Sequence, residues 1–110
     1  MTTTKTVPAD VRAKALEQFG EDALQVVETK RGEVLVRAPK RGEWKRFKSA
    51  AINEKQRADA TENLVRSCVV YPPEAEFSAL LERFPALADS LGEIVVDLAG
   101  AEDTLVGKAP

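Results

Sequence analysis

The sequence has 110 residues, of which 44% are hydrophobic and 31% are charged. This length suits one domain with a single modest core, and the composition is too apolar for a fully disordered chain. The formal net charge is −2, which argues against a nucleic-acid-binding protein because such proteins carry a basic excess. One basic run lies within residues 40–48; a solvated helix face explains it most simply, and a DNA-binding surface is the alternative.

The first part of the chain is predicted to form a polar tail, a helix and a hairpin. Residues 1–7 read as the tail. Pro8 and Asp10 then open a helix that ends at Gly20. Residues 24–29 and 33–38 are predicted to form a β-hairpin around the turn Lys30-Arg31-Gly32. The second strand alternates between two faces, with Val34 and Val36 on one and Leu35 and Arg37 on the other.

Beyond Pro39 the apolar spacing becomes helical. Trp44, Phe47 and Ala51 mark a first helix, which residues 53–56 either interrupt or continue. Helical periodicity resumes over the apolar positions Ala60, Leu64, Val65, Cys68 and Val69. Tyr71-Pro72-Pro73 breaks the pattern, because a residue before proline disfavours the helical conformation.

Two more helices are predicted before the C-terminus. The first presents the apolar residues Phe77, Leu80, Leu81 and Phe84. The second begins at Pro85, ends at Gly100 and presents Leu87, Leu91, Ile94, Val95 and Leu98. The predicted fold is therefore α+β and mostly helical: an N-terminal helix, a β-hairpin and three to four packed helices. We expect one domain over residues 8–100 and a flexible tail over residues 101–110.

The sequence offers little for catalysis. It has no histidine, and its one cysteine, Cys68, allows neither an intramolecular disulfide nor a Cys/His zinc site. No phosphate-binding glycine motif occurs. Asp89, Glu93 and Asp97 recur every four residues on one helix face, where a solvated acidic face is a better explanation than a catalytic pair. We predict no enzyme, and no catalytic, metal-binding or cofactor-binding residues.

The chain is predicted to be cytoplasmic. The N-terminus lacks the apolar segment of a secretory signal. The longest apolar run is far shorter than the roughly 20 residues that cross a bilayer. We therefore expect no membrane contact. Cys68 lies in an apolar run of the chain, so we expect its thiol to be buried and unreactive.

The last helix carries more apolar surface than one core contact needs. Val96 points about 180° from Leu87, and the small residues Ala88, Gly92 and Ala99 fill the arc between them. Such a helix is either packed on two sides or offers its second side to a partner. Trp44 and Phe47 allow the same two interpretations, core packing or an aromatic anchor for a partner. The candidate partner-binding residues are Trp44, Phe47, Ala88, Gly92, Val96 and Ala99.

Two segments resemble the tail assembly chaperones of long-tailed bacteriophages. The first runs from Val34 through Pro39 to the acidic-aromatic pair Glu43-Trp44 and on to Phe47. The second is the apolar stretch from Leu64 to Val70, followed by Tyr71-Pro72, an acidic helix and Arg83-Phe84-Pro85-Ala86-Leu87. The resemblance covers roughly residues 23 to 100. It lies in the order and residue composition of the segments and includes no catalytic motif.

The resemblance implies a function and a set of partners. Such proteins bind the hydrophobic tape-measure protein, help tail-tube protein assemble around it, and are absent from the finished virion. Their genes often also encode a longer, frameshifted form, for which Val106-Gly107-Lys108 is the candidate site here. A homo-oligomer is a further expectation. The alternatives are a virion structural protein, such as a tail connector or head-completion component, and a small DNA-binding regulator.

Overall fold

The computed structural model describes residues 6–100 and 107–109 and confirms the α+β, mostly helical fold. A short 3-10 turn (Glu21–Ala23) joins the first helix to the first strand. The elements in chain order are α1 (Ala9–Phe19), β1 (Leu24–Thr29), β2 (Gly32–Arg37), α2 (Arg41–Ala51), α3 (Arg57–Cys68), β3 (Val69–Tyr71), α4 (Glu74–Arg83) and α5 (Ala86–Leu98).

The predicted N-terminal helix and hairpin are both present. Pro8 precedes the first turn of α1, and Gly20 ends the helix with a φ of 83°. β1 and β2 pair antiparallel, with Thr29 opposite Gly32. Gly32 has a φ of 125°, a conformation that favours glycine. The hairpin turn therefore depends on having glycine at position 32.

The structure adds a third strand that the sequence analysis assigned differently. The apolar periodicity predicts Val69 as part of the preceding helix, but α3 ends at Cys68 and β3 continues directly from it. β3 pairs antiparallel with β2, which makes β2 the central strand of a three-stranded sheet. A strand of three residues is too short to produce the alternation that identifies strands in a sequence. The open question at residues 53–56 is also settled, because these residues form turns that separate α2 from α3.

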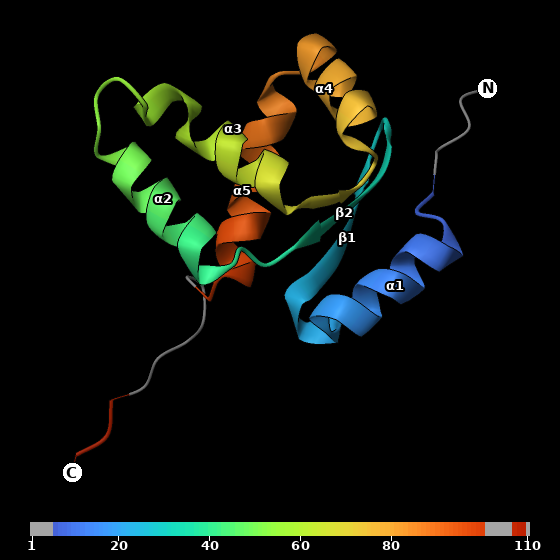
Figure 1. Cartoon of the computed structure of the whole chain (residues 1–110), viewed down its shortest axis with the longest axis horizontal. Coiled ribbons are helices and arrows are strands. Elements are labelled where there is room, and N and C mark those ends of the chain that lie inside the picture. Colours follow the sequence, from blue (N-terminus) through green and yellow to red (C-terminus); the bar gives the residue numbers. More distant parts are fainter. Residues whose placement is uncertain (1–5, 101–106, 110) are drawn as a thin grey trace.

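The sheet separates two unequal layers (Figure 1). α1 lies against one face, where Leu35 packs with Val7 and Ala15. The helices α3, α4 and α5 cover the other face, on which Val34 and Val36 lie. The predicted division of β2 into two faces is therefore confirmed, and both faces are buried because the strand lies between two layers.

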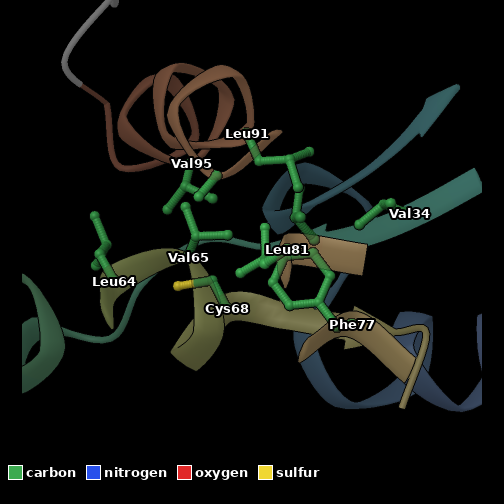
Figure 2. Packing of buried hydrophobic residues seen from close by; sticks show 10 residues of the cluster. Val34, Leu64, Val65, Cys68, Phe77, Leu81, Leu91 and Val95 are labelled. Atoms are coloured by element: carbon green, nitrogen blue, oxygen red, sulfur yellow. The ribbon is translucent and has the colours of Figure 1, made fainter. Parts of the chain in front are cut away.

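The main core forms where three helices meet the sheet (Figure 2). Its fully buried side chains include Val65 and Cys68 from α3, Phe77 from α4, and Leu91 and Val95 from α5. Burial of each of the Val, Phe and Leu side chains contributes about 1.5–3 kcal/mol. This core fixes α3 and α5 side by side, and the candidate site lies along their junction.

The predicted N-terminal tail over residues 1–7 is wrong at its last residue. Val7 is only 5% exposed, and its backbone N–H donates a hydrogen bond to Glu33 Oε1 at 2.9 Å. The physical reason is that Val7, an apolar residue next to the start of α1, packs with Ala15 and Leu35 on the same face of the sheet. The predicted C-terminal tail falls mostly outside the described residues; residues 107–109 are exposed and have no regular structure.

Candidate protein-binding site

A shallow groove of about 660 Å³ runs along α5 where it meets α3 and α2. Phe47 from α2 and Leu64 from α3 contribute apolar surface, and Val96 contributes it from α5. Phe47 and Val96 are half-buried: both pack against the core from its edge while part of each side chain stays exposed. The groove is the surface that best matches the predicted partner-binding face, because it includes Phe47, Gly92 and Val96.

One side of the groove is acidic. Asp89, Glu93 and Asp97 line it, all three are exposed, and they follow one another at four-residue intervals along α5. Four residues of α-helix rise about 6 Å, so the carboxylates form a row. Within residues 6–100 and 107–109, none of these carboxylates makes a hydrogen bond or an ion pair. The groove therefore combines apolar surface with a row of negative charges that have no partner among the described residues.

Ala88 and Gly92 do not face a partner, contrary to the prediction. Both are buried: Ala88 belongs to the main core, and Gly92 lies against Thr61 of α3. A Cβ at Gly92 would stand 2.5 Å from Thr61 Cγ2. The reasoning that small residues allow a close helix approach was correct, but the helix that approaches is α3 of the same chain. Gly92 still borders the groove through its backbone.

The other predicted binding residues divide between core and surface. The rings of Trp44 and Phe47 lie 5.3 Å apart with an interplanar angle of 36°, and both pack against the core. Trp44 does not line the groove, whereas Phe47 does. Ala99 is exposed beyond the last turn of α5, outside the groove lining. Sequence reasoning missed Thr61 and Leu64, although their three-residue spacing on a predicted helix places them on one face.

Arg37 holds α2 in position beside α3, and thereby places Phe47. Its guanidinium makes a bidentate ion pair with Glu43, with Nη1–Oε1 at 2.8 Å and Nη2–Oε2 at 2.9 Å. Nη2 also donates to the carbonyl oxygen of Ser67 at 2.6 Å. Glu43 Oε1 accepts a further bond from the backbone N–H of Lys40 at 2.8 Å. One guanidinium thus joins the end of β2, the first turn of α2 and the last turn of α3.

The ion pair shifts the pKa of Glu43 strongly. Hydrogen bonding from Arg37 lowers the pKa of this carboxyl from its ordinary value of 4.5 to about 2, because the bonds stabilise the charged form. Both side chains are largely buried, at 11% exposed for Arg37 and 14% for Glu43. A largely buried bidentate pair of this kind has a structural role, because both side chains are fully engaged with each other and neither is available for catalysis.

Cys68 is an unreactive core residue. Its side chain is fully buried in the main core, as the sequence predicted. Burial raises the pKa of the thiol to about 11, because the low-polarity surroundings disfavour the thiolate. A thiol in that state is a poor nucleophile near neutral pH.

A second, smaller cleft of about 250 Å³ lies between the hairpin turn and α4. Arg31 and Arg83 lie at its edge, and the Arg31 guanidinium stacks over the Phe84 ring with its carbon 3.8 Å from the ring centroid. This stacking ties the turn to the end of α4. Among the described residues, no group of three or more His, Cys, Asp or Glu side chains is placed to hold a metal ion. No helix in the same part of the chain has the length and apolarity needed to cross a membrane.

A family model described as a domain of unknown function, DUF6848, matches residues 12–108. The chain belongs to the DUF6848 family. No curated protein matches its sequence. Among solved structures, an uncharacterised protein from Bacillus stearothermophilus, rbstp2171, matches with a TM-score of 0.67 and 22% identity, over 88% of this chain and 99% of that one. At that identity the likeness shows a shared fold.

The DUF6848 match contains the whole groove. The lining residues extend from Phe47 to Asp97, well inside the matched range of 12–108. The groove therefore belongs to the DUF6848 domain itself and is not formed by a segment that lies outside it.

Proposed function

We propose that this DUF6848 protein binds a helical protein client in the groove along α5 and acts without catalysing a reaction. The observation that carries the proposal is the groove itself. Phe47 and Val96 are anchored in the core at one edge and exposed at the other. Apolar side chains held in this way give a rigid surface for the apolar face of another helix. Binding would remove from water the surface that the monomer leaves exposed.

We further propose that the client is a phage tape-measure protein and that the protein is a tail assembly chaperone. Support comes from the resemblance of the segments around Glu43-Trp44 and Tyr71-Pro72 to that group. In this proposal the protein keeps the tape-measure protein soluble in the host cytoplasm, promotes tail-tube assembly around it, and leaves before the virion is complete. A long helix with an apolar face is the type of client that such a groove fits.

A single substitution in the groove tests the proposal. We expect Val96→Asp to reduce recovery of a co-expressed tape-measure fragment about tenfold or more, because a carboxylate would replace apolar surface at the centre of the contact. The melting temperature should fall much less, since Val96 is only half-buried. The measurements are quantitative pull-down and thermal unfolding of the same preparations.

Ser90→Asp is the matched control. It adds the same charge at an exposed position of α5 that does not line the groove, and it should leave client recovery unchanged. If Val96→Asp unfolds the protein, Val96 belongs to the core and the binding face lies elsewhere. A stoichiometric band of this protein in purified virions would contradict the chaperone and favour a virion structural component.

A further inference from the structure

We infer that the groove selects client helices whose apolar stripe is flanked on one side by Lys or Arg at four-residue spacing. This inference rests on the proposed function, because it names the class of partner for the same groove. Three features of the groove support it: its shape, the charge of its α5 side, and the match between the repeat of these charges and that of a client helix.

The shape of the groove favours an amphipathic helix over an extended segment. The apolar surface comes from side chains of three helices, namely Phe47, Leu64 and Val96, and none of the sheet strands contributes to it. An extended segment gains affinity by pairing with a free strand edge, which this surface does not offer. Its apolar patches instead accept the side chains that a helix presents at three- and four-residue spacing.

The charge of the groove decides which amphipathic helix fits. A client that covers the groove removes water from Asp89, Glu93 and Asp97, whose carboxylates have no partner in the described parts of the chain. Covering charged groups without supplying counter-charges is costly. A client with cations at this side removes the cost, and one with carboxylates there increases it through like-charge repulsion.

The repeat of the charges matches that of a helix. Asp89, Glu93 and Asp97 span two four-residue steps, or about 12 Å along α5. A client helix that lies alongside α5 presents Lys or Arg at the same interval when these residues recur at every fourth position. The long side chains of Lys and Arg reach across a helix contact while their aliphatic stems stay on the apolar stripe. Each carboxylate can then face one cation.

The test uses synthetic amphipathic helical peptides that share one apolar stripe and differ only in the flanking charges. One peptide carries Lys at every fourth flanking position, one carries Glu and one carries Gln. Fluorescence anisotropy with the full chain should show the Lys peptide binding about tenfold more tightly than the Glu peptide at low salt. The difference should shrink as salt is added, because exposed charges are screened.

The triple variant Asp89→Lys, Glu93→Lys and Asp97→Lys should reverse this preference. The control is Glu17→Lys, Glu54→Lys and Glu82→Lys, which makes the same change in net charge at exposed positions away from the groove. The control should keep the preference for the Lys peptide. Circular dichroism of both variants checks that the fold is retained.

Equal affinity for the Lys and Glu peptides, or the same loss of preference in both triple variants, would overturn the inference. That result would leave the proposed function standing if Val96→Asp still weakened all peptides, since the groove would then bind helices without selecting by charge. If Val96→Asp had no effect on any peptide, the proposed site itself would fail. Self-association that the groove variant alone abolishes would identify a second copy of this chain as the occupant and would overturn the assignment of a separate client helix.

Discussion

Gly92 is the residue that lets α5 lie directly against α3. A Cβ at this position would meet Thr61 Cγ2 at 2.5 Å. Alanine is favoured over glycine in a helix by about 1 kcal/mol, but the clash in a packed interface outweighs that gain. We expect Gly92→Ala to lower the free energy of unfolding by about 1–3 kcal/mol, as measured by urea denaturation.

Removing the opposing methyl group should rescue the substitution. Serine lacks Cγ2, so the double variant Thr61→Ser with Gly92→Ala should be more stable than Gly92→Ala alone. The single variant Thr61→Ser completes the double-mutant cycle and isolates the coupling between the two positions. A Gly92→Ala protein as stable as the original would show that α3 and α5 separate easily at this point.

The residues of the candidate site differ in how far their surroundings follow from the sequence. Phe47 and Val96 were predicted to bind a partner from the apolar pattern of their helices, and both line the groove. Gly92, predicted as a small residue that allows a close approach, lies against Thr61 of α3. The surroundings predicted for Ala88 were wrong. Periodicity gives the direction of a side chain around its own helix, but it does not identify the neighbouring helix that covers it. Whether Ala88 meets the core or a partner depends on tertiary packing.

At the scale of elements, α1 packs against the smaller of the two apolar clusters, apart from the main core. Ala15 is its only buried residue among those described, and it packs with Val7 and Leu35 on the sheet face away from the main core. Elements with few buried apolar contacts open at lower free energy than the rest of the molecule. α1 should therefore open without unfolding of α3 and α5.

Native-state hydrogen exchange can measure this difference. We expect the amides of α1 to exchange through a local opening, and those of α3 and α5 through global unfolding. Ala15→Asp should remove the protection of α1, because a carboxylate would replace a buried methyl group. Protection in α3 and α5 should be retained. Equal loss of protection in all three helices would show that α1 is part of the cooperative core.

The elements that the sequence predicted are those with a strong local signal. Pro8 and Gly20 mark the ends of α1. Gly32 marks the hairpin turn, where the positive φ favours glycine. β3 had no such signal, because its strand conformation depends on pairing with β2. A strand at the edge of a sheet is fixed by pairing with residues far away in the chain. From its neighbours in the sequence alone, Val69 is therefore predicted to continue the preceding helix.

At the scale of the whole molecule, stability should depend on pH through the Arg37–Glu43 pair. The pKa of Glu43 is about 2 in the folded protein against an ordinary value of 4.5. As the pH falls, the unfolded chain therefore takes up the proton first. The stabilisation is complete above about pH 4.5 and is lost as the pH falls toward about 2.

Glu43→Gln isolates this contribution. The variant keeps the size of the side chain and removes its charge, so we expect it to cost about 1–3 kcal/mol at neutral pH. Its free energy of unfolding should also fall less steeply than that of the original protein over the same acid range. Urea denaturation at a series of pH values measures both effects. Parallel curves for the two proteins would mean that Glu43 is not the group responsible.

The buried position of Cys68 affects how assemblies of this protein should be interpreted. A thiol enclosed in the core and held in its protonated form cannot reach another molecule while the chain is folded. A disulfide-linked pair of chains seen after storage in air would therefore record molecules that had unfolded. It would not report a native association, which must come from non-covalent contacts that survive a reducing agent.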